Sequence, residues 1–180
     1  MSDFLMLNPL SHLYLQTNYL RNMIESDKIF MQEAIALSLK GMTNNEGGPF
    51  GAVVVKDGKI VGRGNNRVTS TNDPTAHAEV IAIRDACKNL NSFQLDGCVL
   101  YTSCEPCPMC LGAIYWARPD RLVYACTRHD AAAVNFDDAF IYDEIKAPIK
   151  KRQIKTEQVS RDEALVVFKK WQEKMDKTAY

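Results

Sequence analysis

The stretch GAVVVKDGKIVGRGNN, residues 51–66, carries the strongest local signal for the fold. Two apolar runs flank Asp57 and Gly58, and an Asp-Gly pair between such runs indicates a β-hairpin. Two further apolar runs, at residues 97–102 and 121–125, have the length and composition of buried strands. We therefore expect a sheet whose first two strands form a hairpin.

Predicted helices alternate with these strands. One helix is expected from Asp27, as its N-cap, to the turn residues 44–48. Its apolar stripe consists of Phe30, Ala34, Leu37 and Met42. The remaining elements are predicted at residues 77–90 (helix), 106–117 (helix opened by Pro106), 137–145 (helix or turn), 152–159 (edge strand) and 162–177 (helix). Helices interleaved with short buried strands are typical of a layered α/β domain with a mixed sheet.

The composition is that of an ordinary globular protein. The 180 residues are 46% hydrophobic and 24% charged, which favours one domain at 27–180 after an extension of unknown role at 1–26. The 22 basic and 22 acidic residues balance, which argues against nucleic acid or a membrane surface as a partner. No apolar run reaches the about 18 residues of a membrane span, and Asp3 stands where a secretory signal would be positive. We therefore expect a cytoplasmic protein.

The chain has six cysteines: Cys87, Cys98, Cys104, Cys107, Cys110 and Cys126. Their number and spacing do not resemble a disulfide scaffold, and in a reducing cytosol cysteines are more often metal ligands or catalytic groups. Three of them follow at intervals of three in TSCEPCPMC, residues 102–110. This segment is therefore a candidate metal site.

Two of these cysteines and one histidine can share a metal ion. Cys107 and Cys110 are three residues apart in the first turn of a predicted helix, where the helix dipole favours thiolates. His77 and Glu79 begin another helix, and residues two apart point roughly 200° apart around a helix. Both can therefore address one site only if it lies beyond the N-terminal end of that helix.

Three protein ligands, His77, Cys107 and Cys110, would leave a zinc ion one open position for water, as in catalytic zinc sites. Glu79, which would not be a ligand, would then carry the proton of that water. A closed structural zinc site that adds Cys104, or an iron–sulfur cluster held by thiolates, is the alternative. A third thiolate would fill the position that water needs, so we expect Cys104 to lie on the incoming loop and to bind no metal.

His77-Ala78-Glu79 followed by Pro106-Cys107-Pro108-Met109-Cys110 matches HxE and PCxxC, the signature of zinc nucleobase deaminases. From about Phe30 to Tyr180 the chain also resembles the bacterial guanine deaminases of the cytidine deaminase-like superfamily, whereas residues 1–26 fall outside the resemblance. The stretches that carry it are GGPFGAVVVKDG (47–58), NDPTAHAEVIAIR (72–84), YTSCEPCPMCLGAIYWARP (101–119), NFDDAFIY (135–142) and the terminal Tyr180.

The resemblance implies zinc-dependent hydrolysis of guanine to xanthine and ammonia, with one zinc ion per subunit. It implies a three-layer α/β/α fold around a central mixed sheet of five strands. It also implies a homodimer in which the C-terminal segment, about residues 150–180, is exchanged between subunits and covers the partner's pocket.

The resemblance further implies substrate contacts and a second proton carrier. The substrate contacts would be Asn66, the backbone N–H of Ala78, Phe50 with the imidazole of His77, Trp116, and Tyr180 of the partner subunit. Asp138 would carry a second proton, with Asp137 as the alternative. Purely structural roles remain open for these residues: a turn for Asn66, the core for Phe50 and Trp116, and a helix cap for Asp138.

Other functions share the signature. tRNA adenosine deamination uses the same zinc chemistry but would favour a strongly basic surface, which this neutral chain lacks. Deamination of cytosine, guanosine or a triazine such as ammeline depends on the shape of the pocket, which motifs do not show. A non-catalytic zinc-binding dimerisation module is the alternative of another class. Glu79 argues against it, because a structural site does not need that carboxylate.

Overall fold

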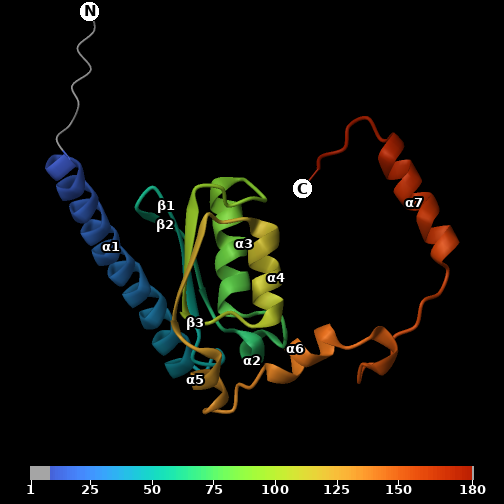
Figure 1. Ribbon diagram of the computed structural model, residues 1–180. Helices are drawn as coiled ribbons and strands as arrows, with labels where there is room; N and C mark the ends of the chain where they lie inside the picture. The colour runs from blue at the N-terminus through green and yellow to red at the C-terminus, as the bar shows by residue number, and fades with distance from the viewer. Residues whose placement is uncertain (1–8, 180) are drawn as a thin grey trace, which may run out of the picture. The chain divides into compact units, whose positions relative to one another are not determined.

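The computed structural model describes residues 9–179 and divides the chain into two compact units, with the boundary between Asp137 and Asp138. The first unit contains α1 (Pro9–Thr43), β1 (Gly51–Lys56), β2 (Lys59–Asn65), α2 (Val68–Thr71), α3 (Ala78–Leu90), β3 (Cys98–Cys104), α4 (Pro108–Ala117), β4 (Arg121–Cys126) and α5 (Arg128–Ala132) (Figure 1). The second unit contains α6 (Ala139–Lys146), the 3-10 helix η1 (Ile149–Lys151) and α7 (Arg161–Glu173).

The strands form one mixed sheet in the order β2-β1-β3-β4. β1 runs antiparallel to both β2 and β3, and β3 runs parallel to β4. The β1–β2 connection is the predicted hairpin, because Asp57 and Gly58 both have positive φ angles, 50° and 71°, as a two-residue type I′ turn requires. The hairpin and the two further predicted strands are confirmed.

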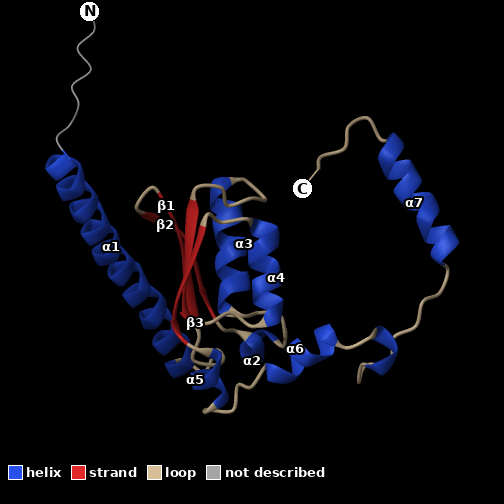
Figure 2. Ribbon diagram, viewed as in Figure 1, coloured by secondary structure: helices blue, strands red, loops and turns tan. Residues whose placement is uncertain are grey.

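Helices cover both faces of this sheet, with α1 on one face and α3 and α4 on the other (Figure 2). Successive residues of β1 point to opposite faces of the sheet, and each face has its own hydrophobic core. Val53 packs in a cluster with Phe30 of α1, and Val54 packs in a second cluster with Ala82 of α3 and Ile114 of α4. The three-layer α/β/α prediction is therefore confirmed.

Glycines in β2 allow α3 to lie directly against the sheet. A Cβ atom on Gly64 would lie 2.1 Å from the carbonyl oxygen of Ala78 and 2.6 Å from the amide nitrogen of Ala82. A Cβ atom on Gly62 would lie 2.4 Å from the carbonyl oxygen of Ala82. Because Ala78 is the first residue of α3, this close approach fixes where the N-terminal end of the helix lies on the sheet.

The first helix starts earlier than predicted and runs for 35 residues. Asp27 is therefore not an N-cap. Its carboxylate accepts a hydrogen bond of 2.7 Å from the Tyr101 hydroxyl on β3 and pairs with Arg121 on β4. The sequence did not reveal this role of Asp27 because its two partners lie 74 and 94 residues away along the chain.

Neither α1 nor any other helix among the described residues has both the length and the apolar character needed to cross a membrane.

The sheet has four strands, one fewer than predicted. Residues 152–159, predicted as an edge strand, form none, and Ile154 and Val159 are 80% and 81% exposed. A strand requires a hydrogen-bonding neighbour. All four strands of the described chain belong to the first unit, so this segment of the second unit has no strand beside it in its own unit. The helices predicted at 137–145 and 162–177 form as α6 and α7.

Gly64→Ala is expected to lower the free energy of unfolding by about 2–3 kcal/mol, because the new methyl group would overlap backbone atoms that cannot move aside. Gly112→Ala in α4 is the matched control, since a Cβ atom there meets nothing within 4 Å. It should be neutral or stabilise the helix by up to about 1 kcal/mol. Urea unfolding of both variants measures the difference, and equal midpoints would contradict the close helix–sheet approach.

Candidate active site

His77 and Glu79 stand at the N-terminal end of α3. His77 is the N-cap residue, with an extended backbone (φ −73°, ψ 154°), and its side chain does not cap the helix. Glu79 is the second helical residue. The Arg67 N–H donates a 2.9 Å hydrogen bond to the carbonyl oxygen of Ala76, which anchors the segment that enters the helix. The imidazole is therefore available to a site beyond the helix end, as the sequence predicts.

Cys107 and Cys110 stand at the N-terminal end of α4. The helix begins at Pro108 and not at Pro106, so Cys107 is its N-cap residue (φ −64°, ψ 167°) and Cys110 lies in its first turn. The predicted start was wrong because a residue that precedes proline, here Cys107, is disfavoured in the helical conformation. Proline is in turn favoured at the first helical position. Both thiols nevertheless face the same side.

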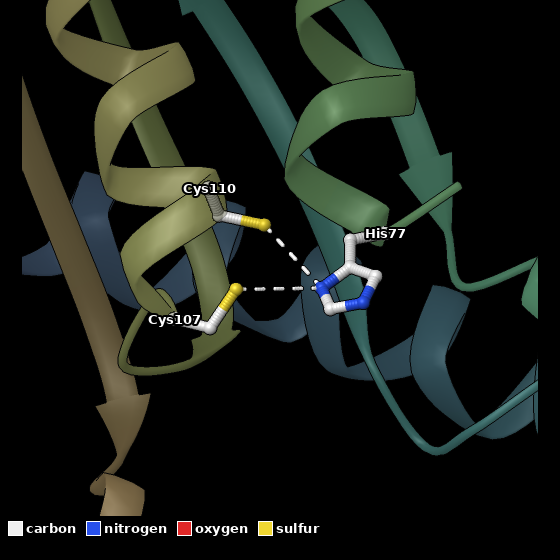
Figure 3. Close-up of side chains that lie close together, drawn as sticks. All are labelled: His77, Cys107 and Cys110. Carbon is white, nitrogen blue, oxygen red and sulfur yellow. Dashed lines mark hydrogen bonds between the residues drawn. The ribbon is translucent and has the colours of Figure 1, made fainter. Parts of the chain in front are cut away.

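The two helix ends bring one imidazole and two thiols together (Figure 3). The Nδ1 atom of His77 lies 3.6 Å from the sulfur of Cys107 and 3.5 Å from the sulfur of Cys110. Among the side chains that the structure describes, these three form the one such group with ligand atoms within 4.8 Å of one another. Zinc bonds of about 2.3 Å to sulfur and 2.05 Å to nitrogen, at a tetrahedral angle, would separate sulfur and nitrogen by about 3.6 Å. The residues therefore fit a tetrahedral zinc ion.

Hydrogen bonds set the charges of this cluster. The interaction with Cys110, and then that with His77, lowers the pKa of Cys107 to about 4, so Cys107 is a thiolate at neutral pH. The same interaction raises the pKa of Cys110 above its usual range, and hydrogen bonding to Cys107 raises the pKa of His77. The cluster therefore holds one anion already, and a divalent cation would displace the remaining thiol proton, because cysteine binds metals as the thiolate.

Glu79 lies beside this cluster and is only 6% exposed. Its Oε2 atom accepts a hydrogen bond of 3.4 Å from the Cys110 thiol. Burial raises the pKa of the Glu79 carboxyl group, because removal from water disfavours the charged form. A raised pKa makes the carboxylate a stronger proton acceptor than an exposed one, which suits general acid–base catalysis.

Cys104 ends β3 and is buried. Its thiol lies 3.5 Å from the carbonyl oxygen of Thr127, to which it donates a hydrogen bond. Burial raises the pKa of Cys104 to about 11, so this cysteine stays a neutral thiol at physiological pH. The group of candidate ligands does not include it. This arrangement favours an open site with three protein ligands over a closed site with four.

Three of the predicted substrate contacts, Asn66, Ala78 and Phe50, lie near the N-terminal end of α3. Asn66 directly follows β2 and is 5% exposed. Ala78 is the first residue of α3, so its N–H has no partner within that helix. Phe50 directly precedes β1, and Phe136 packs edge-on against its ring at a centroid distance of 5.0 Å. Phe136 lies in the stretch 135–142 that carries the family resemblance, but it was not predicted as a site residue, because its contact with Phe50 joins residues 86 positions apart.

The other predicted site residues lie on other parts of the chain. Trp116 lies on α4 and is 64% exposed. Asp138 directly precedes α6 in the second unit, and its neighbour Asp137 ends the first. Tyr180 lies outside the described residues. The catalytic and substrate roles of these residues stay predictions.

Comparison with known proteins agrees with this geometry. The family model described as the cytidine and deoxycytidylate deaminase zinc-binding region matches residues 24–126, more than half of the chain. The chain belongs to this deaminase family. The matched region contains the three candidate ligands and Glu79, so membership in a zinc-binding family supports zinc as the metal that this cluster would hold.

Relatives within the family differ in how much of the chain they match. Guanine deaminase from Bacillus subtilis is 56% identical over 151 residues, 84% of this chain and 97% of the relative. A crystal structure of guanine deaminase from Bacillus subtilis matches with a TM-score of 0.83 and 55% identity, over 85% of this chain and 98% of that chain. tRNA-specific adenosine deaminase from Aquifex aeolicus is 40% identical over 98 residues, 54% of this chain and 62% of the relative.

Single cysteine substitutions test which thiols bind the metal and whether Cys104 is one of them. Cys104→Ser is expected to retain the zinc of the unchanged protein, whereas Cys107→Ser and Cys110→Ser should lose most of it, because each removes one of three ligands. Atomic absorption on protein dialysed against metal-free buffer measures the zinc content. Equal loss in all three variants would show that Cys104 belongs to the site.

Proposed function

We propose that this protein is a zinc-dependent guanine deaminase, which converts guanine and water to xanthine and ammonia. The observation that carries the proposal is the meeting of His77, Cys107 and Cys110 at 3.5–3.6 Å beside the buried Glu79. The match to guanine deaminase from Bacillus subtilis supports guanine as the substrate.

The extent of that match favours guanine over tRNA. It leaves 29 of the 180 residues unmatched, fewer than the 43 residues from Asp138 to Tyr180, so it must extend into the second unit. The match to the tRNA-specific adenosine deaminase spans 98 residues, few enough to fall within the first unit. The balance of 22 basic and 22 acidic residues also disfavours a polyanionic substrate.

When bound, the zinc ion supplies a water molecule that is acidic enough to act as a nucleophile near neutral pH. Glu79 takes the proton of that water at its carboxylate and delivers it to the purine. This proton would go to a ring nitrogen, and the second proton of the water would pass from the added hydroxyl group to the amine, which leaves as ammonia. Glu79 and Asp138 divide these transfers, with Asp137 as the alternative to Asp138.

The substrate contacts suit a flat, neutral base. Phe50 and the imidazole of His77 flank the ring, and the edge-on contact of Phe136 holds Phe50 in place. The Ala78 N–H, which has no partner within its helix, donates to an acceptor of the purine. Asn66 forms a hydrogen bond with the edge of the purine, and Trp116 lines the pocket.

The working form in this proposal is a cytoplasmic homodimer with one zinc ion per subunit, in which residues from about 150 to 180 are exchanged and Tyr180 reaches the site of the partner subunit. Residues 1–26 are an extension, and 27–180 form the catalytic domain. Apolar side chains of α7 that the chain itself leaves uncovered support the exchange: Val167 and Phe168 are both 66% exposed. Sedimentation that finds only monomers would refute this assembly.

Purified zinc-loaded protein should release ammonia from guanine faster than from guanosine, cytosine, adenine, ammeline or a tRNA anticodon stem-loop. The physical reason is that Asn66 and the Ala78 N–H offer directed hydrogen bonds to a flat, neutral base, whereas the charge-balanced chain does not favour a polyanion. A coupled ammonia assay measures each rate. Turnover of cytosine or the stem-loop, with none of guanine, would refute guanine as the substrate.

Glu79→Gln should keep zinc and lose kcat by at least about 10²-fold, because the amide cannot accept the proton of the attacking water. Glu33→Gln on the exposed side of α1 is the matched control and should be fully active. Zinc content and kcat are measured on the same samples. Loss of zinc from Glu79→Gln would instead identify Glu79 as a metal ligand.

A further inference from the structure

Glu46, on the loop of residues 44–50 between α1 and β1, makes contacts that the proposed chemistry does not use. Its Oε2 atom accepts a 2.7 Å hydrogen bond from the side-chain amide of Asn65 and lies 3.5 Å from the guanidinium of Arg67. Its backbone carbonyl accepts hydrogen bonds from the N–H and the hydroxyl of Ser70, at 3.2 and 2.7 Å. Glu46 thus ties the loop to the chain on both sides of Asn66.

The loop in turn fixes the orientation of the Asn66 amide. The Oδ1 atom of Asn66 accepts hydrogen bonds from the backbone N–H groups of Gly48 and Val68, both at 3.2 Å. Two N–H donors can face only the oxygen of an amide, so the NH2 group must point the other way. Among residues 9–179, no hydrogen bond is made by Nδ2 of Asn66. With both lone pairs of its oxygen engaged, this amide can offer a ligand only a donor.

Close packing holds the loop against this amide. A Cβ atom on Gly47 would lie 2.2 Å from Oδ1 of Asn66, so the loop backbone passes directly over it. The Asn66 N–H donates a 3.0 Å hydrogen bond to the carbonyl oxygen of Phe50. The backbone N–H of the next residue, Arg67, donates a hydrogen bond to the carbonyl oxygen of Ala76, which directly precedes His77. The orientation of Asn66 is therefore coupled to the loop on one side and to the metal-site segment on the other.

We propose that Glu46 is a positioning residue for Asn66. It clamps the 44–50 loop to the end of β2, so that the Gly48 N–H keeps the Asn66 amide turned with its NH2 group toward the substrate. The site thereby selects a purine that presents a hydrogen-bond acceptor to Asn66. Guanine offers such acceptors on its carbonyl oxygen and ring nitrogens, whereas an amino group at the same place would present a second donor and be rejected. This inference rests on the proposed function.

The ionisation of Glu46 supports the clamp. The hydrogen bond from Asn65, and then weaker interactions with Asn44 and Arg67, lower the pKa of the Glu46 carboxyl group. The group is therefore a carboxylate at neutral pH, which is the form that accepts hydrogen bonds and attracts the guanidinium.

Glu46→Ala should raise the KM for guanine by about tenfold with a much smaller change in kcat, because one substrate hydrogen bond loses its fixed direction while the metal and Glu79 are unaltered. Glu46→Gln retains an acceptor for Asn65 and should recover most of the loss. Glu33→Ala, on the exposed side of α1, is the control and should not change KM. Zinc content should be equal in all variants. A KM within twofold of the unchanged protein in Glu46→Ala would overturn the inference.

Asn65→Ala removes the other half of the same hydrogen bond and should reproduce the KM change, which keeps the test decisive if Glu46→Ala folds poorly. A double-mutant cycle tests whether Glu46 acts through Asn66. Glu46→Ala should raise KM no further when Asn66 is already alanine, and additive effects would overturn the inference. Failure of the unchanged protein to deaminate guanine would refute the proposed function, and with it this role. Normal turnover with an unaltered KM in Glu46→Ala would refute this role alone.

Discussion

The convergence of two helix N-termini on one point is the constraint on which the site depends. His77 and Cys107 occupy the N-cap positions of α3 and α4, both with extended backbone, and neither side chain caps its own helix. Both ligands are therefore free to face the gap between the helix ends. The positive ends of two helix dipoles favour thiolates there. The glycines of β2 make this possible, because they let the backbone of α3 rest on the sheet.

The grouping of His77, Glu79, Cys107 and Cys110 could be predicted from the sequence because its signals are local. Cys107 and Cys110 lie within one turn, His77 and Glu79 within another, and each pair marks a helix start. The hairpin was equally local, since Asp57 and Gly58 supply the turn by themselves. The start of α4 was misplaced by two residues because both Pro106 and Pro108 are compatible with a helix start.

The errors and omissions involve contacts between distant residues. Asp27 is a residue type that is favoured at helix N-caps, but its side chain instead bonds partners on β3 and β4. Residues 152–159 were predicted as an edge strand, but they have no neighbouring strand in their own unit. Glu46 and Phe136 were not predicted as site residues, because their contacts with Asn65 and Phe50 become visible only when the chain is folded. Sequence patterns report what a segment can form, and long-range pairing decides which of those forms is realised.

Local sequence motifs and long-range contacts each account for a different part of the site. The metal ligands and Glu79, which local motifs mark, supply the chemistry common to the deaminase family. In the proposed function, the loop of residues 44–50 and the amide of Asn66, which long-range contacts hold, determine which hydrogen bonds a base must offer. In this account, a shared zinc centre and a variable set of surrounding loops let related deaminases act on different bases.

X-ray absorption spectroscopy at the zinc edge, on the zinc-loaded protein without substrate, tests the central claim most directly. An open catalytic centre held by His77, Cys107 and Cys110 predicts two sulfur neighbours at about 2.3 Å and two nitrogen or oxygen neighbours at about 2.0–2.1 Å. One of the latter would be the imidazole and the other water. Three sulfur neighbours would place Cys104 in the coordination shell, leave no position for water, and contradict the account.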